Sequence, residues 1–291
     1  MSWITEPLEF AFFRHGLLVA TMAGALCGLI GVYVTLRGMS YIGHGLSHAI
    51  FGGAAASALI GFNFYVGAGL WGMASALAIG RVTRRRIIGS DAAIGVVTTA
   101  SFAFGIALLG LYGQVRRSID AAIFGSILGV TMADVWVVAG VTLAATAIVL
   151  GFYRKLLFTT FDPEVADVSG VNTARMDALL MLLLSVSILA TMKVLGVVLI
   201  AATLVIPAVV ARMLTSSFGR MLWLSTLIGA GCGFAGMVLS YHLDVSSGAT
   251  IVLVGAALFA VVFALTGPGG RRRAGGLAEH EAPGLVSRPG R

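Results

Sequence analysis

Charged residues are scarce in this chain. Lysine, arginine, aspartate and glutamate together make up 11% of its 291 residues, whereas soluble globular domains carry about 25%. Hydrophobic residues account for 58%, so the chain has too little polar surface to cover itself in water. This composition excludes an ordinary soluble domain and predicts an all-α membrane protein.

Cysteine is nearly absent, and the motifs of several enzyme classes are missing. Cys27 and Cys232 each lie inside an apolar run, so both are predicted to be small packing residues without a disulfide. The chain has no Gly-x-x-x-x-Gly-Lys-Ser/Thr loop and is not expected to hydrolyse ATP itself. It has no His-Glu-x-x-His either, which argues against a membrane metalloprotease. Acidic residues are missing from the middle of the apolar runs, which argues against a proton-driven transporter.

Apolar runs long enough to cross a bilayer repeat along most of the chain. A spanning helix needs about 20 apolar residues. One candidate run is short and another is dotted with polar residues, so we predict eight to nine transmembrane helices. Residues 1–267 are expected to form one transmembrane domain, and residues 268–291 a disordered cytoplasmic tail rich in Gly, Pro and Arg. The predicted spans are His15–Leu36, Tyr41–Gly61, Tyr65–Gly80, Ala92–Tyr112, Met132–Tyr153, Met176–Met192, Leu195–Leu214, Met221–Tyr241 and Thr250–Thr266.

The basic residues indicate how the chain is oriented. The net charge is +7, but the basic residues stand in short clusters between apolar runs, so nucleic acid is not an expected partner. With the N-terminus outside, 13 of the basic residues up to Arg273 face the cytoplasm and only Arg14, Arg116, Arg117 and Lys193 face outward. Because cytoplasmic loops carry the excess of Lys and Arg, we expect the N-terminus outside and the C-terminus in the cytoplasm. This argument requires an odd number of spans.

Two short patterns predict close helix packing. Gly24/Gly28 and Gly229/Gly233 each follow the Gly-x-x-x-Gly spacing that lets transmembrane helices approach closely. A third pair, Gly125/Gly129, has the same spacing. In a chain with 39 glycines such pairs also arise by chance.

Two histidines at membrane depth are the main candidate site. His44 and His48 are four residues apart, so they share one helix face. Polar groups inside a bilayer cost free energy and often mark a functional site, and neutral imidazoles suit zinc and similar divalent metals. The alternative is that both histidines hydrogen-bond to neighbouring helices.

Three other polar residues are weaker candidates for the metal path. Asp120 follows two arginines on the predicted outer side and is either a gate residue or an ion-pair partner. His242 and Asp244 follow the eighth span and belong either to a metal path or to a solvated loop. Asp120–Val130 is too short to span the bilayer and is expected to be a partial or surface helix.

The run from Phe161 to Gly170 predicts a short helix outside the membrane. Asp162 is a suitable N-cap, Pro163 a first helical residue, Glu164 a first-turn anion and Gly170 a terminator. In the predicted orientation this acidic helix lies on the cytoplasmic face. It is either a simple connector or an element that a motor subunit pushes.

Several of these runs together resemble the permeases of the zinc/manganese-type ABC importer family. The resemblance covers about residues 10–266, in the order found in that family. The runs that carry it are Leu36-Arg-Gly-Met-Ser-Tyr-Ile-Gly43, Leu46-Ser-His48, Phe124-Gly-Ser-Ile-Leu-Gly129, the run beginning Phe161-Asp-Pro-Glu-Val-Ala166, Val205-Ile-Pro-Ala208 with Ala211-Arg212, and Ser240-Tyr with Leu243-Asp244 and Ser247-Gly248.

The resemblance implies a fold and a set of partners. The fold is that of a type II ABC importer permease in the bacterial inner membrane, a homodimer with the metal path at its axis. The implied partners are two ATPase subunits and an extracytoplasmic metal-binding protein. The segment Asp162–Gly170, including Ala166, is implied to dock on the ATPase.

The resemblance also implies the cargo. His48 matches the family's histidine in the metal path, whereas the family usually has an aspartate where this chain has His44. The exchange makes the site softer and favours zinc as the transported ion, with manganese second. No permanently bound cofactor is expected.

Two other functions remain open from the sequence. One is a permease of the same fold for a metal chelate such as a siderophore or cobalamin, although intramembrane histidines do not suit a bulky cargo. The other is an intramembrane hydrolase using Ser47 and His48. Neighbouring residues on a helix point about 100° apart, which makes a poor nucleophile and base pair.

Overall fold

The structure is a computed structural model that describes residues 6–84, 89–112, 129–196 and 199–266. Within these ranges every element is helical, as predicted. The predicted tail, Asp120 and most of the predicted helix Asp120–Val130 lie outside the described residues. The elements are η1 (Pro7–Glu9), α2 (Ala11–Leu36), α3 (Ile42–Leu59), α4 (Phe64–Arg84), α5 (Ser90–Tyr112), α7 (Met132–Gly151), α8 (Tyr153–Phe161), α9 (Pro163–Val168), α10 (Thr173–Leu195), α11 (Ile200–Leu214), α12 (Phe218–Leu243) and α13 (Ser247–Thr266).

Each predicted span coincides with a helix, but the helices differ in how well they suit a membrane. Over the described residues, six helices are long and apolar enough to cross a bilayer, namely α2, α5, α7, α10, α12 and α13. Helix α3 contains His44 and His48, and α4 contains Arg81, which make both less apolar. The count of nine crossings therefore stays a prediction, whereas a multi-pass membrane protein is established.

The predicted span Leu195–Leu214 was wrong at its beginning. Helix α10 continues to Leu195, where Gly196 ends it with a φ of 76°, a conformation that favours glycine. Helix α11 begins only at Ile200 and has 15 residues. At about 1.5 Å per residue it is roughly 22 Å long, shorter than the bilayer core of about 30 Å.

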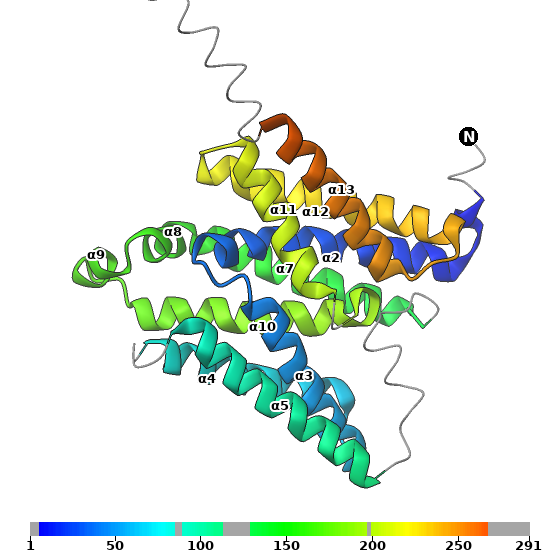
Figure 1. Ribbon diagram of the computed structural model, residues 1–291, viewed down its shortest axis with the longest axis horizontal. Coiled ribbons are helices and arrows are strands. Elements are labelled where there is room, and N and C mark those ends of the chain that lie inside the picture. The colour runs from blue at the N-terminus through cyan, green and yellow to red at the C-terminus, as the bar shows by residue number, and fades with distance from the viewer. Residues whose placement is uncertain (1–5, 85–88, 113–128, 197–198, 267–291) are drawn as a thin grey trace, which may run out of the picture.

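Helix α2 is the central element of the bundle. In Figure 1 it runs through the middle of the molecule, with α12 and α13 on one side and α3, α4 and α5 on the other. It packs against α7, α10, α11 and α12. Helix α10 lies beside it and also contacts α3 and α4, so it joins the two sides of the bundle.

The two Gly-x-x-x-Gly runs lie at a close helix contact, as their spacing predicted, and the structure shows that they meet each other. A side-chain carbon on Gly24 would collide with the carbonyl oxygen of Gly229, and one on Gly233 with that of Ala20. At Gly28 the neighbour is Ser225, whose hydroxyl donates a hydrogen bond of 2.6 Å to the Gly28 carbonyl. The backbones of α2 and α12 therefore lie in direct contact, which only glycine permits at these positions.

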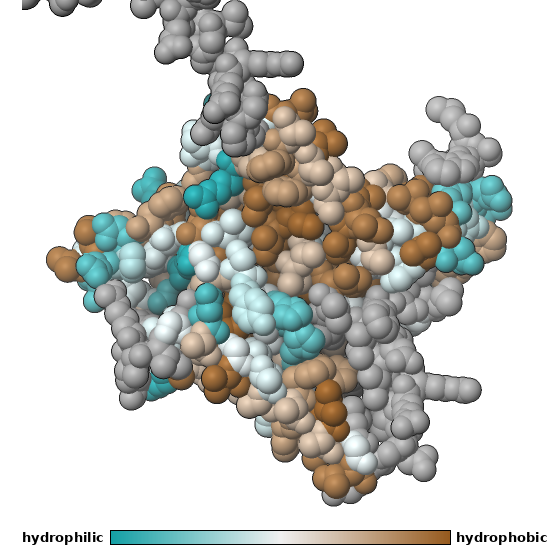
Figure 2. Space-filling view, viewed as in Figure 1, coloured by the Kyte–Doolittle hydropathy of each residue, from teal (hydrophilic) through white to brown (hydrophobic). Residues whose placement is uncertain are grey.

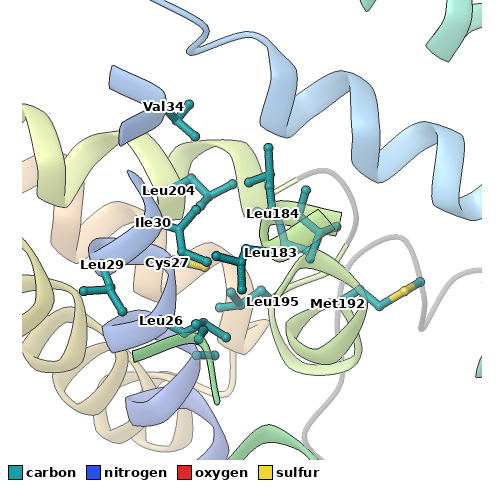
Figure 3. Close-up of a cluster of buried hydrophobic side chains, with 14 of the residues drawn as sticks. Leu26, Cys27, Leu29, Ile30, Val34, Leu183, Leu184, Met192, Leu195 and Leu204 are labelled. Atoms are coloured by element: carbon teal, nitrogen blue, oxygen red, sulfur yellow. The ribbon is translucent and has the colours of Figure 1, made fainter. Parts of the chain in front are cut away.

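The core around α2 is closely packed and apolar. Figure 3 shows Leu26, Cys27 and Ile30 of α2 together with Leu183 and Leu184 of α10, and with Leu195 and Leu204. Cys27 and Cys232 are both buried and free, at positions where a small side chain packs between helices.

The outer surface is apolar, as a lipid-facing surface requires. Helix α7 exposes Trp136 and Leu143, and α13 exposes Leu253 and Leu265. Figure 2 shows hydrophobic residues over the region of α11, α12 and α13. The chain lacks the polar surface of a protein dissolved in water, so the surface agrees with the composition.

Candidate functional site: an imidazole pair and a projecting helix

The two histidines form a contacting pair on one face of α3. His44 lies in the first turn of this helix and His48 one turn later, so their side chains point the same way. The Nε2 atoms of the two rings are 3.3 Å apart. Both side chains are half-buried, and Tyr41 extends the same face, with its ring 5.6 Å from that of His44.

Close packing of α3 on α5 sets the position of His48. A side-chain carbon on Gly45 would collide with Ile94 and Thr98, and one on Gly52 with the carbonyl of Ser101. This close approach brings Phe102 of α5 to an edge-on contact with the His48 ring at 4.7 Å. The imidazole of His48 is therefore held between His44 and Phe102.

The pair has the spacing of two ligands on one metal ion. Zinc binds imidazole nitrogen at about 2.0–2.1 Å in a tetrahedral arrangement, which places two such nitrogens about 3.3 Å apart. The observed Nε2 separation is 3.3 Å. The same distance suits a hydrogen bond in which one neutral ring donates to the other.

The pair is not a complete metal site. Among the described residues no group of three or more His, Cys, Asp and Glu side chains could hold an ion. The Nδ1 atom of His48 is buried and finds no hydrogen-bond partner within the same part of the chain. A tetrahedral ion would need two further ligands.

Ser47 does not act with the histidines. Its side chain is fully buried, and its hydroxyl donates a hydrogen bond of 2.8 Å to the carbonyl oxygen of His44 in its own helix. A hydroxyl held in this way is not presented to the His48 ring. The hydrolase alternative therefore has no nucleophile and base pair here.

The other predicted metal-path residues lie apart from the pair. His242 is in the last turn of α12 and Asp244 is its C-cap, with a left-handed φ of 53°. The ring of His242 contacts Tyr241, which packs on Phe13 near the N-terminus. The fold does not bring these residues into one cluster with His44 and His48 over the described ranges.

The predicted acidic helix is present as α9. The Asp162 carboxylate accepts a hydrogen bond of 2.9 Å from the Val165 amide, and Pro163 is the first helical residue. Gly170 takes a φ of 83° just after the helix. Glu164 lies in the first turn, and Ala166 is fully buried and anchors the helix.

Helix α9 projects from one end of the molecule and exposes apolar side chains. In Figure 1 it lies at the tip beyond α8, and Figure 2 shows hydrophobic residues at that tip. Val168 is 91% exposed and Phe161 63% exposed. Val165 is exposed as well. Exposed apolar groups beside acidic residues, outside the apolar bundle, are typical of a protein-protein contact.

Sequence reasoning missed two interhelical ion pairs. Arg37, at the end of α2, contacts Asp177 of α10 at 2.6 Å. Lys193, near the end of α10, contacts Asp134 of α7 at 2.6 Å. Both basic residues entered the orientation argument only as loop charges. No spacing in the sequence signals partners so far apart in the chain.

These features define a class of protein, a multi-pass helical transport subunit. Comparison with known proteins makes the assignment narrower. The chain belongs to the ABC 3 transport family, whose model matches residues 9–266. It is therefore a permease subunit of a metal ABC importer, and the predicted resemblance is confirmed.

Named relatives and a solved structure agree with this assignment. The manganese transport system membrane protein MntC of Halalkalibacterium halodurans is 39% identical, over 89% of this chain and 88% of that protein. The manganese import system permease protein ScaB of Streptococcus gordonii is 35% identical, over 88% of this chain and 91% of that protein. The structure of PsaBC from Streptococcus pneumoniae in complex with Fab matches with a TM-score of 0.80 at 33% identity, over 90% of this chain and 94% of that chain.

Proposed function

We propose that this permease conducts divalent transition-metal ions past His44 and His48, with zinc as the preferred cargo and manganese second. The observation that supports this most directly is the 3.3 Å separation of the two Nε2 atoms. Two bare imidazole nitrogens at this distance fit one metal ion.

The choice of zinc over manganese follows from the donor atoms. Imidazole nitrogen suits zinc, whereas carboxylate oxygen suits manganese. This chain has His44 where the family usually has an aspartate, so its pair is all nitrogen. The relatives MntC and ScaB are named for manganese transport, which makes manganese the second candidate.

A homodimer would complete the site. One chain supplies two nitrogens, and a tetrahedral ion takes four. If a two-fold axis runs beside the exposed face of α3, the partner subunit adds an equal pair of imidazoles. The half-buried state of both histidines supports this, because a lipid-facing imidazole would be costly and a contact between subunits would remove it from lipid.

Energy would come from a partner ATPase that docks on α9. The exposed apolar residues Phe161, Val165 and Val168 form the contact, and the Asp162 cap keeps the helix rigid. With α9 in the cytoplasm, the N-terminus lies outside and the C-terminus inside. The opposite face then receives the ion from an extracytoplasmic metal-binding protein.

Uptake into liposomes tests the proposal. The permease is co-purified with its ATPase, reconstituted, and supplied with zinc or manganese and ATP. We expect ATP-dependent uptake in the wild type, and loss of uptake in His48→Ala with the complex still assembled. His15→Ala, at the start of α2, serves as the control histidine and should keep uptake. Normal uptake by His48→Ala would contradict the proposed path.

A further inference from the structure

Arg37 joins three helices at one point. Its Nη1 contacts the Asp177 carboxylate of α10 at 2.6 Å. Its Nε donates a hydrogen bond of 3.2 Å to the Thr160 hydroxyl, and its Nη2 one of 3.1 Å to the Thr159 hydroxyl, both in α8. The side chain is only 10% exposed. A planar guanidinium with several donors in fixed directions holds such a geometry, which an ammonium cannot reproduce.

The position of Arg37 in the chain connects it to the histidine pair. It is the C-cap of α2, and the turn that follows contains Gly38 with a φ of 68°. This turn leads directly into α3, whose first turn carries His44. A displacement of Arg37 therefore moves the start of the helix that holds both imidazoles.

The threonines that Arg37 contacts in α8 are followed directly by α9 in the chain. Thr159 and Thr160 lie in the last turn of α8, and Asp162 begins α9 immediately afterwards. The hydroxyl of Thr160 also donates a hydrogen bond of 2.6 Å to the Leu156 carbonyl, so it is fixed in its helix. The proposed ATPase contact and the Arg37 contact are thus on one short rigid segment.

An aromatic cluster holds α8 against α2. The Phe218 ring contacts Tyr33 of α2 at 5.5 Å, and it contacts Tyr153 and Phe161, at the two ends of α8, at 5.6 and 6.1 Å. Asp177, the carboxylate partner of Arg37, also lines a cavity of about 430 Å³ between α4 and α10. Because the rings of the aromatic cluster are closely packed, motion of α8 would pass through them to α2.

We propose that Arg37 is a positioning residue that transmits movement of α8 and α9 to the turn between α2 and α3, and so to His44 and His48. This inference rests on the proposed function. Transmission requires that Arg37 hold Thr159, Thr160 and Asp177 at once. Without these contacts the ATPase still docks and hydrolyses ATP, but hydrolysis is no longer converted into metal movement.

The test measures ATP hydrolysis and zinc uptake in the same liposomes, with the permease and its ATPase assembled. For Arg37→Gln we expect an intact complex, unchanged basal ATP hydrolysis and a fall of about fivefold or more in zinc moved per ATP, the range of ordinary coupling energies. Thr159→Val with Thr160→Val keeps the Arg37–Asp177 pair and the side-chain shape, and should lower the same ratio. Arg37→Lys keeps the charge and should restore part of it.

Lys193→Gln is the matched control. It removes an ion pair of α10 that is also 2.6 Å long, near the opposite end of that helix, and should leave the ratio unchanged. An unchanged ratio in both Arg37→Gln and the threonine double variant overturns the assignment. So does an equal fall in hydrolysis and uptake with loss of the assembled complex, because the role is then structural. If the wild type takes up neither metal, the proposed function itself fails, and this assignment falls with it.

Discussion

His44 differs from an aspartate in both charge and donor atom, and the two differences act in the same direction. A carboxylate supplies a negative charge and hard oxygen ligands, whereas the neutral imidazole supplies softer nitrogen. The neighbouring His48 nitrogen, 3.3 Å away, belongs to the same site. At the scale of one residue, this exchange is therefore expected to set the preference among divalent metals.

We predict that His44→Asp shifts selectivity from zinc toward manganese. The uptake ratio of zinc to manganese should fall by about tenfold, which corresponds to a change of about 1.4 kcal/mol in relative binding. The measurement is competitive uptake of both metals into liposomes. His242→Asp, a histidine at the end of α12, should leave the ratio unchanged. An unaltered ratio in His44→Asp would sink the idea that this residue selects the metal.

The crossing of α2 and α12 offers a test at the scale of the helix. Gly24 faces the backbone of Gly229, and a methyl group there would collide with a carbonyl that has no freedom to move away. We predict that Gly24→Ala lowers the stability of the permease in detergent by about 1–3 kcal/mol, the usual cost of overpacking. Thermal unfolding followed by circular dichroism measures the loss.

Gly140 in α7 is the matched control for this substitution. Among the described residues, no atom outside its own stretch of helix lies within 4 Å of a side-chain carbon built on it. Gly140→Ala should therefore be neutral or slightly stabilising, because alanine loses less conformational freedom than glycine in a helix. Equal losses of stability in the two variants would show that the crossing is not as close as the structure indicates.

Helix α9 offers a second test at the scale of the helix. We predict that Val168→Asp weakens binding of the ATPase by about tenfold or more, since a charge would be buried in an apolar contact. Co-purification from detergent extracts measures the retained ATPase. Val245→Asp changes another exposed valine, in the connection between α12 and α13 at the other end of the molecule, and should retain it. Full retention in Val168→Asp would place the docking surface elsewhere.

At the scale of the whole molecule, α2 connects the proposed metal path to the proposed ATPase contact. Helix α2 runs through the centre, its C-terminal end meets α8, and the turn beyond it begins α3. One chain supplies two imidazole nitrogens to the proposed metal path, whereas a tetrahedral ion takes four ligands. If the proposed homodimer forms, the stoichiometry of metal binding is a property of the assembly and not of one subunit.

We predict one tightly bound zinc ion for every two permease chains. Two pairs of imidazoles around a two-fold axis supply four nitrogens, which complete a tetrahedral site. Native mass spectrometry of the dimer in zinc measures the stoichiometry, and His48→Ala should abolish binding. One ion per chain, or binding by monomers, would contradict a site shared between subunits.

Composition and spacing determined the elements of this protein. Apolar runs predicted the long helices because a helix in lipid needs only its own sequence to satisfy its backbone, whereas η1 and α8 were not predicted. The caps of α9 and the shared face of His44 and His48 were equally local, since they depend on residues within one turn or two. The beginning of α11 was misplaced because Gly196 gives a weak signal inside an apolar run.

Only the tertiary structure decided which helices meet. The contact of Gly24 with Gly229, the edge of Phe102 against His48, and the link from Arg37 to Asp177 join residues far apart in the chain. One sequence does not encode such pairings in any short-range pattern, because they arise from the packing of whole helix surfaces. The sequence alone thus determined a membrane bundle in which two histidines share one helix face, and packing decided how that face connects to the rest of the molecule.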